Sequence, residues 1–339
     1  MKRLSRKTIL LLSVGIALVA GIDFWMGLRS ADGTQPAIES ITIATNTEYL
    51  GACPVIAAQS QGYFSNHRLR VQLQPYSSGK QAMNAVLSNK ADMATVADIP
   101  IMFAALNGLP LQVITTIFRT GQDHGLVARR DHGINQASDL KGKRIGVTLT
   151  TSGHFALEVF LNRQRLDTHD VQLRNYPPEG LLQALVNGEV DAVSGWDPFL
   201  KLIQERLGTV ALRFPGRDIY ESIYNIAALT PYLQQHRQTV VRLLRALEQG
   251  ERFCRSQPTA AINLLPQLTP EGKAALLAEW PLHHFGLELD QSLLLVLEDQ
   301  SRWAIKSGLS PASTVPNFLD YIYVDGLKAV SPNEVTIIN

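Results

Sequence analysis

Apolar and polar residues follow two different periods along the chain after residue 40. Short stretches with apolar residues at alternate positions predict strands, and stretches of about ten residues with one apolar face predict helices. The predicted strands cover residues 41–46, 70–76, 91–97, 111–119, 125–131, 144–148, 170–176, 190–196 and 209–214. The predicted helices cover residues 53–64, 79–89, 98–108 and 179–188, with two more that begin at Gly153 and Pro198. Strands that alternate with helices predict an α/β fold with a mainly parallel sheet.

After residue 230 the pattern becomes almost entirely helical. Val240, Leu243, Leu244 and Leu247 fall on one face of a helix predicted for residues 238–250. Similar patterns occur at residues 258–265, 271–279 and 291–305. We therefore predict a helical C-terminal part that covers one of two α/β lobes.

Two stretches of the chain resemble each other. Residues 81–98 can be laid on residues 180–197, and in both a helix and a turn lead into a strand between two acidic residues. The matched pairs are Asp92 with Asp191, Asp98 with Asp197, Met83 with Leu182 and Thr95 with Ser194. Any helix–turn–strand unit can look like this, but the match favours two related lobes. Ligands of open α/β sheets bind beyond the carboxyl ends of the strands, so the two matched strand ends are expected on opposite walls of one cleft.

The N-terminus has the pattern of an export segment. Lys2, Arg3, Arg6 and Lys7 precede residues 8–28, which are apolar apart from Asp23. The segment can be a cleaved signal or an uncleaved membrane anchor, and its length slightly favours the anchor. Either alternative places the rest of the protein in the periplasm or at the outer face of the cytoplasmic membrane.

Charge and cysteine content limit the classes of partner. The 339 residues have a formal net charge of +1, which argues against a nucleic-acid partner. Cys53 and Cys254 are the two cysteines, and an oxidising compartment would permit a disulfide between them. They lie about 200 residues apart on different predicted helices, so we expect them to stay unpaired. Zinc-site and redox spacings are absent, and no metal or cofactor is expected.

Several stretches together resemble a known family. They are "PVIAAQSQGYF", "GKQAMNAVLSNKADMATVADIP", "DLKGKRIGVTLTTSGH" and "LLQALVNGEVDAVSGWDPF", followed by the helical end. In this order they resemble the substrate-binding proteins of ABC importers for nitrate, alkanesulfonates, taurine and thiamine precursors. The same superfamily includes a pyrimidine-synthesising enzyme of thiamine biosynthesis and ligand-sensing modules of signalling proteins.

The resemblance implies a two-lobed periplasmic-binding-protein fold of type II, a Venus flytrap whose chain crosses twice between the lobes. It places lobe I at residues 40–124 and 226–320 and lobe II at residues 125–225, after a signal or anchor at residues 1–30. It also implies a monomer that encloses a small ligand at the hinge and meets a membrane permease with its ATPase. No nucleotide-binding motif lies in this chain, so the ATPase would be a separate subunit.

The loop "TLTTSGH" is the first candidate for ligand contact. Thr151 and Ser152 can donate hydroxyl hydrogens, Gly153 permits close approach, and His154 lies in the first turn of the predicted helix. Thr151 or Ser152 can equally serve as a helix cap. Unpaired N–H groups at such a helix start favour an anion.

Other candidates come from the first lobe and from strand ends. Ser78 and Gly79 open a helix in what we take to be the matching loop of the first lobe. Asp98 and Asp197 stand at strand ends and could bind an ammonium group, although each is favoured as a helix cap before a proline. Aromatic contacts are expected from Tyr49 and Trp196, for which core packing is the alternative.

No enzyme signature is present: the chain has no GxSxG, HExxH, Walker or dinucleotide-binding motif, and no catalytic residue is expected. We therefore predict an extracytoplasmic solute-binding protein of an ABC importer, with a small anionic or zwitterionic ligand of the sulfonate, taurine or nitrate kind. The alternative is a membrane-anchored sensing module for a signalling partner. A protein that binds or synthesises a thiamine pyrimidine precursor is a third hypothesis.

Overall fold

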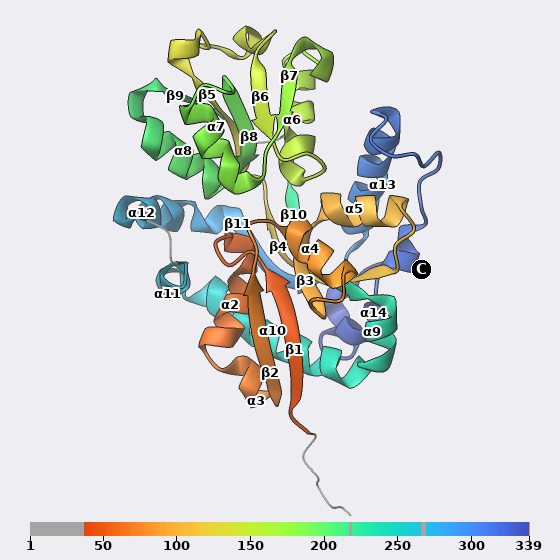
Figure 1. The fold of residues 1–339 in the computed structure, drawn as a ribbon. Helices are drawn as coiled ribbons and strands as arrows, with labels where there is room; N and C mark the ends of the chain where they lie inside the picture. Colours follow the sequence, from red (N-terminus) through yellow and green to blue (C-terminus); the bar gives the residue numbers. More distant parts are fainter. Residues whose placement is uncertain (1–36, 217–218, 266–268, 339) are drawn as a thin grey trace, which may run out of the picture. The chain divides into compact units, whose positions relative to one another are not determined.

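The structure, a computed structural model, describes residues 37–216, 219–265 and 269–338. Residues 39–339 form one compact unit that contains two β-sheets and their helices (Figure 1). No helix within the described ranges is long and apolar enough to cross a membrane. The predicted export segment at residues 1–30 lies outside the described residues.

The first sheet has six strands in the order β11-β4-β10-β3-β1-β2. We call this sheet with its helices the first lobe. Its strands are β1 (Glu39–Thr45), β2 (Leu69–Pro75), β3 (Met93–Ala97), β4 (Leu111–Thr120), β10 (Ser222–Leu229) and β11 (His283–Glu288). Its helices are α2 (Cys53–Ser60), α3 (Tyr63–Asn66), α4 (Gly79–Leu87), α5 (Asp98–Leu106), α9 (Thr230–Gln235), α10 (Arg237–Ser256), α11 (Pro258–Asn263), α12 (Pro270–Glu279), α13 (Gln291–Lys306) and α14 (Val324–Lys328).

The second sheet has five strands in the order β7-β6-β8-β5-β9, and this sheet with its helices is the second lobe. Its strands are β5 (His124–Arg129), β6 (Arg144–Val147), β7 (Gln172–Asn175), β8 (Ala192–Trp196) and β9 (Ala211–Pro215). Its helices are α6 (Ser152–Arg163), α7 (Leu181–Val186) and α8 (Phe199–Leu207), which surround the sheet in Figure 1.

The two sheets share one topology. Five neighbouring strands of the first sheet, β2-β1-β3-β10-β4, correspond in order and direction to β7-β6-β8-β5-β9. The chain passes from the first sheet to the second between β4 and β5, and returns between β9 and β10.

The prediction of a mainly parallel sheet is wrong. Strands β5 and β10 follow directly on a crossing between the lobes, and each pairs antiparallel with both of its neighbours. Strand β11 also pairs antiparallel with β4, so the sheets are mixed. A strand that enters a sheet from the other lobe arrives from the opposite end, whereas a βαβ crossover returns the chain to the same end.

The two acidic residues that match in the internal similarity have the same structural role. Asp92 Oδ2 accepts a hydrogen bond of 2.7 Å from Thr42 N, and Asp191 Oδ2 accepts one of 2.9 Å from Arg144 N. In both cases the Asp N–H donates back to the carbonyl of the same partner residue. The repeated pair joins β3 to β1 in one sheet and β8 to β6 in the other, which supports two related lobes.

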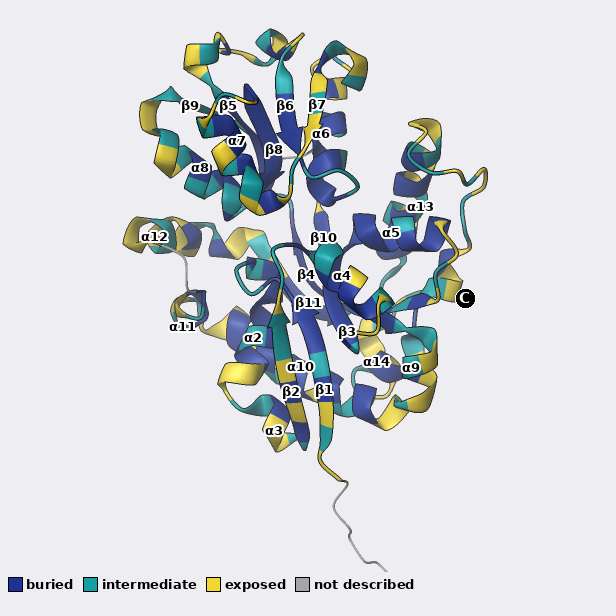
Figure 2. Cartoon of the chain, viewed as in Figure 1, coloured by how far each residue is buried: buried dark blue, intermediate teal, exposed yellow. Residues whose placement is uncertain are grey.

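The core follows from the apolar strands between helices. The strands β3 and β8 are buried along their whole length, as Figure 2 shows in dark blue. The predicted helix at residues 53–64 is interrupted, because Gly62 has φ of +74° and separates α2 from α3. Residues 283–288, which carry the pair "HH", form the edge strand β11 that the pattern did not predict.

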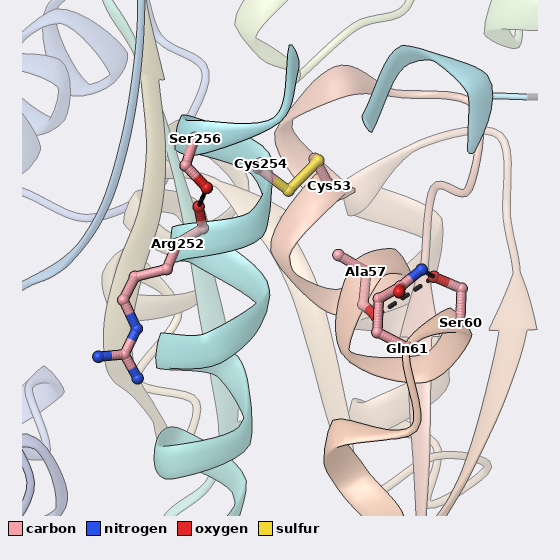
Figure 3. The surroundings of a disulfide bond; sticks show 7 residues. All are labelled: Cys53, Ala57, Ser60, Gln61, Arg252, Cys254 and Ser256. Carbon is pink, nitrogen blue, oxygen red and sulfur yellow. Dashed lines mark hydrogen bonds between the residues drawn. A yellow bond between two sulfur atoms is a disulfide. The ribbon is translucent and has the colours of Figure 1, made fainter. Parts of the chain in front are cut away.

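A disulfide joins Cys53 to Cys254, so the expectation of two unpaired thiols is wrong. Cys53 begins α2 and Cys254 lies near the end of α10, and the two helices lie side by side (Figure 3). Gly250 permits this packing, because a Cβ at that position would lie 2.1 Å from the Pro54 carbonyl oxygen. Two residues 201 positions apart are thus brought together by the packing of two helices.

Candidate functional site

A cavity of about 370 Å³ lies between the lobes. We call it the donor cavity, because most of its polar groups donate hydrogen bonds. The first lobe contributes Asn46, Tyr49, Ser78, Gly79, Lys80, Ala97, Pro100, Ser222 and Tyr224, and the second lobe contributes His124, Thr151, Ser152 and Trp196. Six of the ten predicted site residues are among them: Tyr49, Ser78, Gly79, Thr151, Ser152 and Trp196.

Two helix N-termini meet at this cavity. Ser78 caps α4, and its hydroxyl accepts a hydrogen bond of 3.2 Å from Gln81 N. Thr151 occupies the cap position of α6, but its hydroxyl donates to the Thr148 carbonyl instead. The first N–H groups of each helix have no intrahelical acceptor, and they carry the positive end of the helix dipole.

Glycine lets both helices begin close to a strand end. A Cβ at Gly79 would lie 2.9 Å from Val96 Cα, and a Cβ at Gly153 would lie 3.1 Å from Gly195 Cα. The two loops are not counterparts, contrary to the sequence interpretation. Helix α4 follows β2, whose counterpart is β7, whereas α6 follows β6, whose counterpart is β1.

The charge around the donor cavity favours an anion. None of the described residues that line it carries a carboxylate, whereas Lys80 supplies an ammonium group. The ammonium group of Lys80 donates 2.9 Å to the Leu149 carbonyl and also contacts the Thr150 hydroxyl, so it links the lobes. Burial lowers the pKa of Lys80.

Aromatic rings form the apolar walls. Trp196 is 7% exposed, and its ring lies beside His124 and Phe199. Tyr49 contacts Tyr224 edge to face, with the ring centroids 4.8 Å apart. These rings can cover the apolar part of a small ligand.

The other four predicted site residues are not among those that line the donor cavity. Gly153 packs against the Trp196 ring, and His154 is buried behind the loop, where its Nε2 lies 3.4 Å from Glu158. Burial, together with Lys80, lowers the pKa of His154 to about 4. Ligand contact by these residues stays a prediction.

The two acidic candidates have protein partners. Asp98 is fully buried and accepts hydrogen bonds from the Tyr220 hydroxyl and, at 2.5 Å, from Gln300 Nε2. Asp197 forms an ion pair of 3.1 Å with Arg213. Neither carboxylate caps a helix as expected: Ala97 is at the cap position of α5, and Pro198 is at that of α8.

The buried Asp98 carboxyl predicts a pH-dependent stability. Burial raises the pKa of Asp98 to about 6, against the effect of its hydrogen-bond donors Tyr220, Gln300 and the Ile99 amide. Its pKa is higher in the folded chain than in the unfolded chain, where it is about 4. The folded state therefore binds this proton more tightly, and the associated stability is present below about pH 4 and is lost as the pH rises through about 6.

We expect Asp98→Asn to raise the free energy of unfolding by about 2–3 kcal/mol at pH 7.5 relative to the original chain, and to remove this difference near pH 4. The Gln300 amide can rotate to accept from the new side chain, because its Oε1 has no partner among the described residues. Urea unfolding at a series of pH values measures the effect. A difference between the two chains that does not change with pH would contradict it.

A second cavity, of about 470 Å³, shares Tyr49 with the donor cavity. The lining of this second cavity is acidic, unlike that of the donor cavity. It includes the side chains of Glu48, Asp123, Asp197 and Glu279. Lys201 lies among them and forms ion pairs with Asp197 and Glu279. The carboxylates are thus gathered outside the donor cavity.

The residues that sequence reasoning missed in the donor cavity come mostly from the crossing strands. His124 begins β5, and Ser222 and Tyr224 lie at the start of β10. These strands reach the cavity only because they pair antiparallel with the strands whose ends face it. Asn46 follows β1 directly, so the rule that ligands bind beyond strand ends could have found it.

Comparison with known proteins identifies the family. The family described as NMT1/THI5 like matches residues 49–261, which is more than half of the chain. The chain belongs to this family. A relative from Bacillus subtilis (strain 168), provisionally named an aliphatic sulfonates-binding protein, is 24% identical over 250 residues, with 72% of this chain and 73% of the relative covered.

Solved structures confirm the periplasmic-binding-protein fold of this NMT1/THI5-like chain. The periplasmic aliphatic sulphonate binding protein SsuA from Escherichia coli has a TM-score of 0.70 at 20% identity, covering 84% of this chain and 97% of that one. A mutant of DszB in complex with biphenyl-2-sulfinic acid has a TM-score of 0.58 at 17% identity, covering 86% and 99%.

Proposed function

We propose that this protein is an extracytoplasmic solute-binding protein of an ABC importer, which captures a small anionic or zwitterionic solute of the sulfonate, taurine or nitrate kind. The observation that carries the proposal is the donor cavity, which lies between the lobes, collects two helix N-termini and has no carboxylate among its described lining residues. The names of the relatives support the same class of ligand.

The lining of the cavity suits a small anion with a short apolar tail. The head would meet the N-termini of α4 and α6, and the tail would lie between Tyr49 and Trp196. A protonated amine at the far end of the tail would point toward the acidic side chains beyond Tyr49.

Closure of the lobes over the ligand is the proposed mechanism. The lobes already touch through polar contacts besides that of Lys80. The Trp303 indole donates 2.8 Å to Glu158, and Lys201 lies 3.0 Å from Glu279. A ligand that contacts both lobes binds the closed state more tightly than the open one and shifts the population toward it. A membrane permease with its ATPase would recognise the closed form.

We infer that the protein is not an enzyme. Its two cysteines are joined in the disulfide, so no thiol is free to act as a nucleophile. The relative from Bacillus subtilis and SsuA are binding proteins. Incubation with biphenyl-2-sulfinate, the ligand of the DszB structure, and with alkanesulfonates should yield no product by chromatography; formation of sulfite would overturn this inference.

The alternative function is that of a sensing module, and the reason for it is the apolar segment at residues 8–28. A sensor would retain the segment as an anchor and pass ligand occupancy to a signalling partner. Determining the N-terminus of the exported protein separates a cleaved soluble carrier from an anchored form. Co-purification with a permease from membranes then favours the importer over the sensor.

A thermal-shift screen tests the proposed ligand class. The panel contains ethanesulfonate, taurine, nitrate, bicarbonate and a thiamine pyrimidine precursor, with ethylammonium as the cationic control. A ligand at a hundredfold excess over its Kd stabilises the folded state by about 2.7 kcal/mol, which corresponds to several degrees in Tm. We expect a shift with at least one anion and none with ethylammonium. The proposed function fails if no anion in the panel shifts the Tm.

A further inference from the structure

The side chain of His124 stands out in the donor cavity. It is 2% exposed, and its Nδ1 lies 2.6 Å from Asp123 Oδ1. Its Nε2 is also buried, but has no hydrogen-bond partner among the described residues. Buried polar atoms are nearly always paired, and His124 lines the donor cavity, so its unpaired ring nitrogen points to a ligand contact.

Asp123 determines which ring nitrogen carries the hydrogen. Burial alone would raise the pKa of Asp123, but His124 and Tyr49 beside it lower it below the usual range, so the carboxyl is ionised. The Tyr49 hydroxyl donates 2.6 Å to the second carboxylate oxygen. An ionised carboxylate can only accept, so Nδ1 of His124 carries a hydrogen, and whenever the ring is neutral its Nε2 has a lone pair and no hydrogen.

That lone pair is a hydrogen-bond acceptor, whereas the helix N-termini at the cavity are donors. Helix N–H groups offer hydrogens to a ligand, and the oxygens of a sulfonate or nitrate can only accept them. An anion beside Nε2 would therefore face a lone pair unless the ring takes up a proton. Protonation turns Nε2 into a charged donor, and hydrogen bonds with an ionised partner are the strong ones.

We propose that His124 contacts the anionic group of the ligand directly, and that binding transfers one proton from solvent to its Nε2. The inference rests on the proposed function and names the residue and the proton linkage of the same site. Histidine is suited to this role because it changes charge between about pH 5 and pH 8. Affinity for an anion is then expected to rise as the pH falls through this range.

Other titratable groups surround the imidazole. Asp98 is the main competitor, since its pKa of about 6 falls in the same range and it is close enough to interact electrostatically with His124. The Tyr220 ring lies edge to face with the imidazole, at 4.9 Å between centroids. Lys80 and Tyr224 lie at the wall of the same cavity. Asp123, the partner of the His124 ring, also interacts with Tyr49, His283 and Asp197.

Calorimetric titration of the purified full chain tests the proposal. The probe is ethanesulfonate, or the tightest-binding anion of the panel, titrated at several pH values in bis-Tris and in imidazole, two cationic buffers of different ionisation enthalpy, because the difference in observed enthalpy between buffers counts the protons taken up. We expect net proton uptake and an affinity that rises by up to about tenfold per pH unit between pH 8 and pH 6. Binding without proton uptake would overturn the proposal and leave the proposed function intact.

Two variants and a control identify the residue that takes up the proton. His124→Gln keeps a polar side chain but cannot become charged, so we expect the loss of proton uptake and a nearly pH-independent affinity, about tenfold weaker at pH 6. His169→Gln is the matched control, because the His169 side chain is 94% exposed and should leave the uptake unchanged. Asp98→Asn should also retain it. Uptake that survives in His124→Gln but disappears in Asp98→Asn would overturn the assignment to His124. If no anion in the panel binds at all, the proposed function fails with it.

Discussion

Replacing Cys53 and Cys254 together by alanine is expected to lower the free energy of unfolding by about 3–5 kcal/mol. The disulfide closes a loop of 201 residues, and the entropy of the unfolded chain that it removes corresponds to about 5 kcal/mol for a loop of this length. Both side chains are buried among apolar neighbours, so alanine introduces no unpaired polar group. Guanidinium unfolding of the oxidised protein and of the double variant measures the difference.

Reduction provides the matched control for this prediction. The original chain with excess reductant should unfold at nearly the same denaturant concentration as the double variant, because both lack the cross-link. Each single variant should behave like the reduced chain, apart from dimers formed through its remaining thiol. An unchanged midpoint in the double variant would mean that the packing of α2 on α10 holds these segments together without the bond.

Trp196→Ala should weaken the binding of an anionic ligand by about tenfold or more, equivalent to at least ~1.4 kcal/mol. The ring forms a wall of the donor cavity and supports the start of α6, where Gly153 packs against it. Its loss removes apolar contact with the ligand and loosens the helix N-terminus that faces the ligand head. Truncation of a buried tryptophan also costs about 3–5 kcal/mol of stability. Titration calorimetry and thermal unfolding measure the two effects separately.

Trp196→Phe distinguishes ligand contact from folding. Phenylalanine keeps an aromatic wall of smaller area, so its affinity should lie between those of the original chain and Trp196→Ala. Phe160→Leu, a change in a buried side chain that does not line the donor cavity, should lower the Tm without changing the affinity. If Trp196→Ala binds the tightest anion of the panel with unchanged affinity, Trp196 does not belong to the site.

Residues from both lobes line the donor cavity, and other contacts also join the lobes. Both sheets have the same topology, and the donor cavity takes residues from each, so under the proposed function ligand affinity and lobe closure would depend on the same contacts. The salt bridge between Lys201 and Glu279 and the contact between Lys80 and Thr150 bridge the lobes at separate places. A ligand held between the lobes would add further contacts of this kind.

Local sequence patterns were sufficient to predict most of the helices and strands. The alternation of strands and helices, the helix starts at residues 79 and 98 and the repeat that pairs Asp92 with Asp191 depend on neighbouring residues, so periodicity and turn chemistry are sufficient to find them. The same reasoning selected Ser78, Ser152 and Trp196 for the cavity, because they stand where a helix begins or a strand ends.

Contacts between segments that are distant in the sequence could not be predicted from these patterns. A strand looks the same in sequence whether its neighbour runs parallel or antiparallel, so the direction of β5 and β10 depended on the path of the chain between the lobes. Pairing of Cys53 with Cys254 depended on how two helices pack. His124 acquires its proposed role only when a crossing strand places it between Asp123 and an otherwise anion-favouring cavity. Local periodicity reports which face of a segment is buried, whereas the partner of that face is chosen by the assembly of the whole chain.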